Sequence, residues 1–355
     1  MSEKQYSLSQ LGWKPYFNQQ LNLDELENCA PFRVVQVFRN RLLVWGENVE
    51  KSISLAEHPE LTECTVGDWI LFSQTSESHQ TDQTIRILER ASFFQRKAPG
   101  SISAQLIAAN IDTAFIVSSC NQDFNLSRIE RYLALAKEAQ TEAVLVLTKS
   151  DLVDQEQQYA YLDQLNDLQP HLMVVLVNAL DPESCKPLLD WYKTGQTCVL
   201  LGSSGVGKTT LTNTLCATEE KTAPIREDDS KGRHTTTARA LFFTQSGGLI
   251  LDCPGMRELQ LTDCEEGVKA VFDDIQQLAL KCKFSDCQHQ LEPKCAVQAA
   301  IVAGTLDERR LVNYQKMLNE QTRNTMSLAE SHQKDREFGK LIKSSQQLKK
   351  TTRET

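Results

Sequence analysis

The sequence has no segment that resembles a secretory leader, and it has no apolar run of membrane-spanning length. The stretch from Met1 to Gln20 is polar and lacks the apolar core of a leader. Uninterrupted apolar stretches fall well short of the roughly 20 residues that a spanning helix needs. We therefore expect a cytoplasmic protein that makes no contact with a membrane.

An excess of positive charge is also missing. The 355 residues carry a net charge of −9 at pH 7, and the isoelectric point is about 5.3. This balance argues against a protein that coats nucleic acid with its whole surface. The segment 331–355 is an exception, since it holds seven Lys or Arg against three Asp or Glu. This basic tail is either a local RNA contact or a solvated, frayed helix.

Length and pattern predict three domains in an α/β multi-domain protein. Residues 1–95 hold short strands typical of an OB-like β-barrel, a fold that often binds oligonucleotides but also serves as a structural module. Residues 96–261 alternate strands and helices, which predicts a mostly parallel sheet with helices on both faces. Residues 262–355 are expected to be helical. The strands expected in the barrel are 32–38, 42–45, 49–55, 69–72 and 84–88.

Two local patterns refine this outline. Ser127 and Glu130 have the spacing of a capping box, which predicts a helix that begins at Arg128. The exit from the barrel combines basic and aromatic side chains, which suits contact with RNA backbone and bases. The residues concerned are Arg86, Arg90, Phe93, Phe94, Arg96 and Lys97.

The segment 202–209 fits G-x-x-x-x-G-K-[ST] and lies between a predicted strand and a predicted helix. Its glycines let backbone N–H groups face phosphate oxygens. Lys208, which we count as catalytic, would reach the β- and γ-phosphates, and the Thr209 hydroxyl would ligate Mg²⁺. The alternative is an ordinary glycine-rich turn. The predicted phosphate cradle consists of Gly202, Ser203, Ser204, Gly205, Val206, Gly207, Lys208, Thr209 and Thr210.

A second motif, D-x-x-G, follows an apolar strand at Asp252-Cys253-Pro254-Gly255. In P-loop GTPases the aspartate holds Mg²⁺, mostly through water, and the glycine N–H senses the γ-phosphate. We assign these roles to Asp252 and Gly255. The polar segment 231–237 suits a switch loop, and one of its threonines could complete the Mg²⁺ shell; a plain surface loop is the alternative.

Two further elements are predicted to bind the base. Thr148-Lys149-Ser150-Asp151 resembles N-K-x-D, whose aspartate accepts hydrogen bonds from guanine N1–H and N2–H₂ and so rejects adenine. Thr148 stands where Asn is usual, which removes one side-chain amide. Asn178 and Ala179 resemble the short S-A element whose backbone N–H meets guanine O6.

Three cysteines and one histidine lie within fourteen residues: Cys282, Cys287, His289 and Cys295. Zn²⁺ prefers sulfur and nitrogen donors, and structural zinc sites are filled by four protein ligands. This set leaves no position open for water, so we predict one structural zinc ion. The alternative is four unrelated buried residues. The other eight of the eleven cysteines are expected to be small core residues.

The order of the motifs is unusual, because the guanine-binding elements precede the phosphate loop. A parallel sheet gathers its carboxyl-end loops at one edge whatever the connectivity, so strands can be permuted without moving the site. From about residue 32 to 314 the chain resembles the ribosome small-subunit-dependent GTPase family (RsgA, also called YjeQ or YloQ), whose members are circularly permuted GTPases. The motifs that carry the resemblance are Gly67-Asp68-Trp69, 108–112, the phosphate loop, 232–237, 252–255 and the Cys/His cluster.

The resemblance implies a monomeric GTPase that binds GTP and GDP with Mg²⁺ and binds the small (30S) ribosomal subunit through 16S rRNA late in its assembly. Met256 stands where many GTPases have a water-orienting glutamine, so intrinsic hydrolysis should be slow, on the order of 10⁻⁴ to 10⁻² s⁻¹. The resemblance gives the water-positioning role to His234, for which a structural role is the alternative.

Two other functions remain open at this point. One is an RNA-binding assembly scaffold that binds guanine nucleotide without useful turnover. The other is an ATP-dependent enzyme, against which Asp151 argues because its carboxylate suits guanine.

Overall fold

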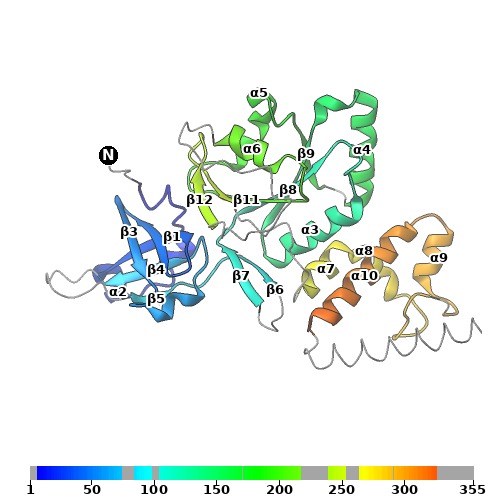
Figure 1. The fold of residues 1–355 in the computed structure, drawn as a ribbon. Coiled ribbons are helices and arrows are strands. Elements are labelled where there is room, and N and C mark those ends of the chain that lie inside the picture. The colour runs from blue at the N-terminus through cyan, green and yellow to red at the C-terminus, as the bar shows by residue number, and fades with distance from the viewer. Residues whose placement is uncertain are drawn as a thin grey trace, which may run out of the picture.

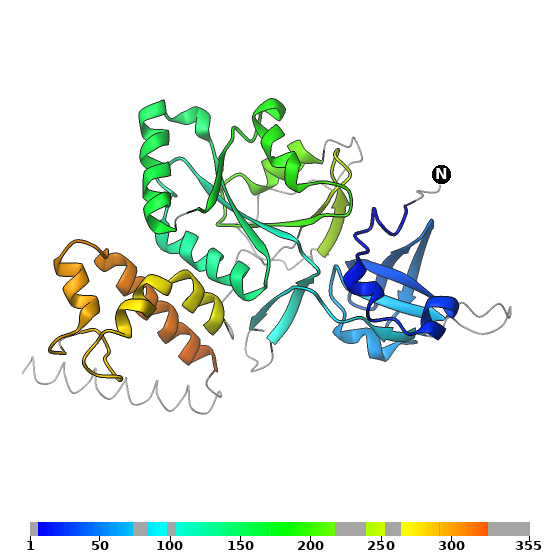
Figure 2. The ribbon, with the colours of Figure 1, turned by 180° about the vertical axis from the view of Figure 1, so that it is seen from behind.

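Three bodies lie in a row in the computed structural model (Figure 1). They are a small antiparallel sheet, a central sheet with helices on both faces, and a group of C-terminal helices. Seen from behind, helix α3 (Leu126–Glu138) lies between the central sheet and the C-terminal helices (Figure 2). The structure describes residues 6–73, 84–97, 104–169, 171–216, 239–252, 264–290 and 292–325, and everything below concerns these ranges.

The N-terminal body contains the five predicted strands, preceded by two short helices, α1 (Pro15–Asn18) and α2 (Leu23–Asn28). The strands pair antiparallel in the order β3-β2-β1-β4-β5 around a buried apolar core, which confirms the OB-like barrel. A 3₁₀ turn, η1 (Pro59–Glu63), precedes β4. The strand bounds are β1 Cys29–Val37, β2 Arg41–Gly46, β3 Val49–Ser54, β4 Trp69–Ser73 and β5 Thr84–Ile87.

The central sheet has the order β10-β9-β8-β11-β13-β12, and all neighbouring pairs are parallel except β12 with β13. Strand β1 of the barrel also pairs with β12, so one ladder runs from the barrel into the central sheet. The predicted α/β layer structure is therefore confirmed. The strand bounds are β8 Thr113–Ser119, β9 Glu142–Thr148, β10 Met173–Leu176, β11 Thr197–Leu201, β12 Arg239–Phe243 and β13 Leu249–Asp252.

Helices cover both faces of the central sheet, because the side chains that point to either face of its strands are apolar. Ala114 and Ile116 of β8 pack with α3 and with α4 (Gln155–Leu168). Phe115 and Val117 pack on the other face with α6 (Lys208–Leu215) and with residues of α5 (Pro182–Cys185) and the 3₁₀ segment η3 (Lys186–Trp191). A buried strand with a helix at each side fixes the position of the loops at its carboxyl end.

The C-terminal body consists of α7 (Glu265–Val271), α8 (Asp273–Ala279), α9 (Ala296–Val302) and α10 (Glu308–Thr325). Helix α7 lies directly on α3, since a Cβ added at Gly267 would sit 2.1 Å from the carbonyl oxygen of Ala134. Among the helices of the described ranges, none is long and apolar enough to cross a membrane.

The predicted capping box at the start of α3 is wrong. Asn125 is the N-cap, and its Oδ1 accepts a hydrogen bond of 2.9 Å from the backbone N–H of Arg128. Glu130 is fully buried and binds side chains of α10 instead of the helix end. Asn125, two residues before the predicted cap Ser127, satisfies the free N–H of Arg128, which leaves Glu130 available for a distant partner.

Other local features differ from the sequence prediction. The hairpin β6 (Phe93–Lys97) and β7 (Ala104–Ala109) was not foreseen, and it spans the predicted boundary at residue 95. The segment 182–191, in the region predicted to alternate strands and helices, is largely 3₁₀, with Pro187 in the first turn of η3. Several predicted features lie outside the described residues: the switch loop 231–237 with His234, Gly255, Met256 and the basic tail 331–355.

Candidate nucleotide site and metal cluster

The predicted strand–loop–helix arrangement is present at the phosphate loop. Strand β11 ends at Leu201 and α6 begins at Lys208, with Gly207 as its N-cap. Gly202 and Gly207 have φ values of 151° and 93°, which side chains rarely adopt. A Cβ at Gly202 would also lie 2.3 Å from the carbonyl oxygen of Val117. The loop therefore needs glycine in order to lie against the end of β8.

The ammonium group of Lys208 lies within this loop. Its Nζ donates a hydrogen bond of 2.7 Å to the carbonyl oxygen of Gly202, and a second one to the carbonyl oxygen of Ser203. Thr209 and Thr210 follow in the first turn of α6 and are partly exposed. Positive charge, a hydroxyl group and the N-terminal end of a helix thus meet at one place, as phosphate binding requires.

Thr148 links the segment predicted to bind the base, 148–151, to the phosphate loop. Its side chain is fully buried at the end of β9. The hydroxyl lies 2.5 Å from the carbonyl oxygen of Val206 and 3.1 Å from that of Ser118, and it is the donor toward both. A buried side chain of this kind acts on the position of the loop rather than on an exposed ligand.

The rest of the segment is held by its neighbours on either side. Lys149 adopts a left-handed conformation, with φ of 58°, and its Nζ donates a hydrogen bond of 2.9 Å to the carbonyl oxygen of Gly205. The backbone N–H of Ser150 donates to the carbonyl oxygen of Val177 at 3.3 Å. Asp151 follows in the 3₁₀ turn η2 (Ser150–Leu152) and is exposed, so its carboxylate faces solvent beside the phosphate loop.

The turn at Asn178 and Ala179 joins the same edge of the sheet. The backbone N–H of Asn178 donates to Ser184 Oγ at 2.8 Å, and Asn178 Oδ1 accepts from the N–H of Leu180 at 3.0 Å. Thr214 of α6 donates to the carbonyl oxygen of Ala179 at 2.6 Å. The loops after β9, β10 and β11 are therefore linked by hydrogen bonds at one edge. The backbone of β13 ends beside them at Asp252.

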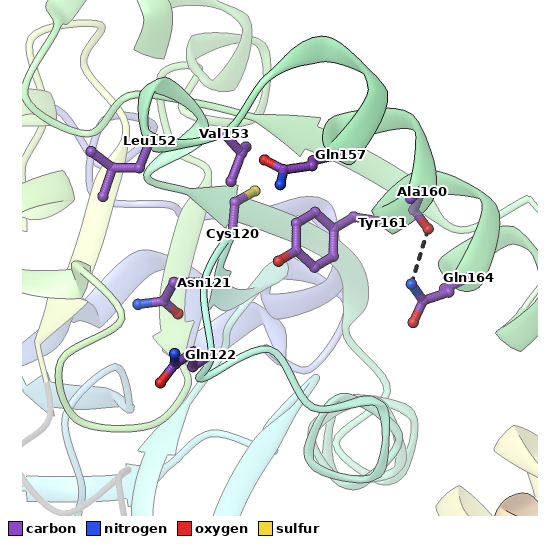
Figure 3. Close-up of a pocket in the computed structure, with 9 residues that line it drawn as sticks. All are labelled: Cys120, Asn121, Gln122, Leu152, Val153, Gln157, Ala160, Tyr161 and Gln164. Atoms are coloured by element: carbon purple, nitrogen blue, oxygen red, sulfur yellow. Dashed lines mark hydrogen bonds between the residues drawn. The ribbon is translucent and has the colours of Figure 1, made fainter.

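A cavity of about 510 Å³ lies beside Leu152, and no motif in the sequence indicates it (Figure 3). Burial, and secondarily the negative charge of Asp151, raises the pKa of the Cys120 thiol to about 11. This thiol is thus protonated at neutral pH, and Asp151 lies close enough to influence it. The cavity is lined by Cys120, Asn121, Gln122, Leu152, Val153, Gln157, Ala160, Tyr161 and Gln164.

The predicted basic and aromatic RNA contact is only partly available. Arg86 binds Glu25 at 2.7 Å, and Arg90 binds the fully buried Asp68 at 2.7 Å. Phe94 is buried as well. Arg86 and Arg90 stabilise the N-terminal body, and Phe94 packs in the core of the central domain. The rest of the cluster on strand β6 is the exposed Phe93 and the half-buried Arg96, which bonds to Gln105.

The four predicted zinc ligands converge. Their ligand atoms all lie within 4.8 Å of one another. The Sγ atoms of Cys282 and Cys295 are 3.9 Å apart, and His289 Nδ1 lies 3.7 Å and 3.5 Å from them. A tetrahedral zinc ion with Zn–S near 2.3 Å and Zn–N near 2.0 Å would place its ligands about 3.5–3.8 Å apart. This cluster, completed by Cys287, can therefore hold a metal ion.

Two causes act on the charge of these ligands. Burial lowers the pKa of His289, which favours its neutral form. Burial acts to raise the pKa of Cys282, but hydrogen bonds from the backbone of Ala296 and Val297, with those of neighbouring thiols, bring the pKa below its ordinary value. Neutral imidazole and thiolate are the forms that bind a metal ion.

The arrangement defines a class of protein. A parallel sheet carries a phosphate-loop motif after β11, and the segments predicted to bind the base follow β9 and β10, which precede β11 in the chain. This is the arrangement of a circularly permuted P-loop GTPase.

Comparison with known proteins gives the family. Residues 87–262 match the RsgA GTPase family. The chain is 51% identical to the small ribosomal subunit biogenesis GTPase RsgA 2 of Vibrio vulnificus, and the match covers 99% of each chain. It is 45% identical to the small ribosomal subunit biogenesis GTPase RsgA of Mesorhizobium japonicum, over 90% of this chain and 91% of that protein. This chain belongs to the RsgA GTPase family.

Solved structures agree on the fold. The crystal structure of YjeQ from Thermotoga maritima matches with a TM-score of 0.59 and 25% identity, over 82% of this chain and 98% of that chain. The structure of YloQ, described as a circularly permuted GTPase, matches with a TM-score of 0.57 and 24% identity over 84% of this chain. These structures confirm the predicted fold class, and the family match with its named GTPase relatives confirms the GTPase activity.

Proposed function

We propose that this chain binds the small ribosomal subunit and hydrolyses GTP during the late maturation of that subunit. The observation that supports it most is the hydrogen-bonded edge where Thr148 joins the Asp151 segment to the phosphate loop. There, one surface combines a phosphate cradle with an exposed carboxylate suited to guanine. The names of relatives at 51% and 45% identity supply the connection with the small subunit.

The nucleotide has a proposed partner for each of its parts. Lys208 and the loop N–H groups bind the β- and γ-phosphates, and the N–H of Gly255 meets the γ-phosphate. The Asp151 carboxylate accepts from guanine, and the Asn178-Ala179 turn lies at the guanine carbonyl. The Thr209 hydroxyl and Asp252 would hold Mg²⁺, which would supply positive charge to offset the charge of the phosphates.

Hydrolysis needs an oriented water molecule. Met256 has no side-chain hydrogen-bonding group suited to this, so we assign the role to His234, whose imidazole can orient water when the subunit positions it. Unassisted turnover is then slow, and the subunit acts as the activator.

The C-terminal cluster is proposed to hold one structural zinc ion through Cys282, Cys287, His289 and Cys295. Four protein ligands fill a tetrahedral shell, so the ion would stabilise the fold of the C-terminal body and take no part in hydrolysis.

Contact with 16S rRNA is proposed for the barrel, for Arg96 and Phe93 of β6, and for the basic tail. The protein would act as a monomer in the cytoplasm, where the small subunit matures.

The deciding experiment is multiple-turnover phosphate release, measured with and without small subunits. Many turnovers per protein, accelerated by the subunit, support the proposal. Binding of the subunit with no more than one turnover would instead favour a nucleotide-binding scaffold. Displacement of labelled GTP by GDP but not by ATP separates both from an ATP-dependent enzyme, because the Asp151 carboxylate repels the N1 lone pair of adenine.

A further inference from the structure

The first turn of α3, residues 127–130, contacts two parts of the protein that are far apart in the chain. On one side it meets the phosphate loop, and on the other it meets α10 of the C-terminal body. The motifs of the nucleotide site do not include this turn.

On the phosphate-loop side, the contact is made by Arg128. Its guanidinium donates a hydrogen bond of 3.0 Å to Ser203 Oγ. The carbonyl oxygen of the same Ser203 accepts from Lys208. A cavity of only about 10 Å³ lies at this contact, and Asn125, Arg128, Ser203 and Val206 are among the residues that line it. Arg128 therefore holds a loop residue that is itself bonded to the phosphate-binding lysine.

On the C-terminal side, α10 holds the same turn through Glu130, whose side chain is 0% exposed. Arg309 donates two hydrogen bonds to this carboxylate, at 2.9 and 3.2 Å. Arg310 donates a third at 2.9 Å, and Asn313 donates a fourth. Arg309 and Asn313 also reach Ser127, at 3.4 and 3.3 Å.

The polar contacts of α10 extend toward the metal cluster. Arg310 donates to both carboxylate oxygens of Asp274 on α8, at 2.7 and 2.9 Å, and to the carbonyl oxygen of Val271. Its guanidinium lies 4.8 Å from the ring centre of Phe272. Helix α8 ends at Ala279, three residues before the ligand Cys282. One set of ion pairs thus joins the C-terminal body to the turn that holds Ser203.

We propose that Arg128 is a positioning residue of the phosphate loop, and that docking of α10 on Glu130 fixes its position. Nucleotide affinity and docking of the C-terminal body are then coupled, and the coupling is reciprocal. This inference rests on the nucleotide binding proposed above. A ribosomal contact that moves α10 would loosen the loop, and a bound nucleotide would tighten the contact between α3 and α10.

A double-mutant cycle tests the coupling in the full-length, zinc-loaded protein, with dissociation constants for fluorescent GDP as the readout. Arg128→Ala and Arg309→Ala should each weaken affinity by about 3- to 10-fold, the range of one exposed charge-assisted hydrogen bond. The double variant should be no weaker than Arg128→Ala alone. Effects that multiply, or an Arg128→Ala variant that binds like the wild type, would overturn the proposal.

Arg131→Ala is the matched control. It removes the ion pair between Arg131 and Glu320 across the same two helices, but away from the phosphate loop. Its GDP affinity should equal that of the wild type. A loss as large as that of Arg309→Ala would mean that general loosening, not the first turn, carries the effect, and would contradict the assignment.

Ser203→Ala provides a second route if an arginine variant folds poorly. It removes the acceptor of the Arg128 hydrogen bond, so it should weaken GDP binding to the same extent and add nothing to Arg128→Ala. Independent, multiplying effects would contradict the proposal. A wild-type protein that binds no guanine nucleotide would instead overturn the proposed function itself.

Discussion

The hydroxyl group of Thr148 makes two buried hydrogen bonds at the position where N-K-x-D has an asparagine. The amide expected at this position of N-K-x-D is missing, yet the hydroxyl reaches both β8 and the phosphate loop, at 3.1 and 2.5 Å. The added Cβ at Gly207 would come within 3.4 Å of the same hydroxyl, so the loop and this residue are closely packed. Position 148 therefore concerns the shape of the site more than the identity of the base.

Thr148→Val should remove this fastening with little change in volume. The carbonyl oxygen of Val206 loses its buried donor, which should lower the free energy of unfolding by about 1–3 kcal/mol. GDP affinity should fall with it, because the loop is no longer held. Urea denaturation and GDP titration measure the two effects.

Thr141→Val is the control for this variant. Thr141 is also a buried threonine, and it donates to the carbonyl oxygen of Ala136 at 3.0 Å, far along α3 from the phosphate loop. The Thr141→Val variant should have a lower free energy of unfolding but the same GDP affinity as the wild type. Equal affinity in Thr148→Val and the wild type would show that the fastening is irrelevant to binding.

His234→Ala tests the proposed water-positioning group. Nucleotide affinity should stay within about twofold of the wild type, while turnover stimulated by the small subunit is lost. His234→Gln, which keeps a group able to orient water, should retain part of the stimulated rate. Normal stimulation in the alanine variant would assign His234 a structural role.

At the scale of elements, apolar runs with clear ends were the most predictable features. The strands expected before the phosphate loop and before D-x-x-G are present as β11 (Thr197–Leu201) and β13 (Leu249–Asp252), because a strand buried on both faces is a short, almost purely apolar run. The β6–β7 hairpin escaped prediction, because β6 mixes aromatic and charged residues and Phe93 is exposed. The break between α7 and α8 escaped as well, since Phe272 carries no breaking signal and is buried at the bend.

The candidate site was predictable to the extent that its parts are local motifs. The phosphate loop and the Asp151 segment were found because fixed spacings reflect fixed backbone shapes. The contacts of Thr148 with Val206 and of Glu130 with Arg309 join residues 58 and 179 positions apart. Such pairs depend on how whole elements pack, so no local pattern could reveal them.

Removal of the metal ion tests the C-terminal cluster. Chelation should lower the thermal stability of α8 and α9 and reduce their helical signal, because the proposed ion would hold together the segment 282–295 that joins these two helices. Nucleotide binding should persist, and the GDP affinity should fall by at most about 10-fold because α10 no longer docks on α3. Circular dichroism measures the thermal stability, and GDP titration measures the nucleotide affinity. Unchanged melting after chelation would contradict a structural metal.

Cysteine substitutions supply the matched pair for this experiment. Cys295→Ser should lose the stoichiometric zinc, whereas Cys185→Ser should keep it, since Cys185 is buried against Asn178 in the central domain. Metal analysis of the purified proteins distinguishes them.

At the scale of the whole molecule, the three bodies are joined by buried polar contacts. Arg33 of β1 is 1% exposed and donates to the carbonyl oxygens of Leu11 and Asn110, so it links the N-terminal segment, the barrel and the central domain. Burial lowers the pKa of Arg33 to about 10, and the guanidinium remains charged at neutral pH. Glu130 plays the corresponding part at the other end of the central domain.

Glu130→Ala should be among the most destabilising substitutions in the chain. It leaves the partly buried Arg309 and the buried Arg310 without this carboxylate, and removal of one partner from a buried ionic cluster costs about 3–5 kcal/mol. Glu320→Ala, in the more exposed pair with Arg131, should cost about 1 kcal/mol or less. Equal losses of unfolding free energy in the two variants would refute this ranking.

The pairing of β1 with β12 bears on how the chain folds during synthesis. Gln36 lies opposite Ala240 in this ladder, so the barrel can form its internal pairs early, but its seam with the central sheet must wait until residue 240 has left the ribosome. Until then the free edge of β1 is an exposed strand edge, which other chains could join. The earliest time at which this seam can close is therefore set by the pace of translation.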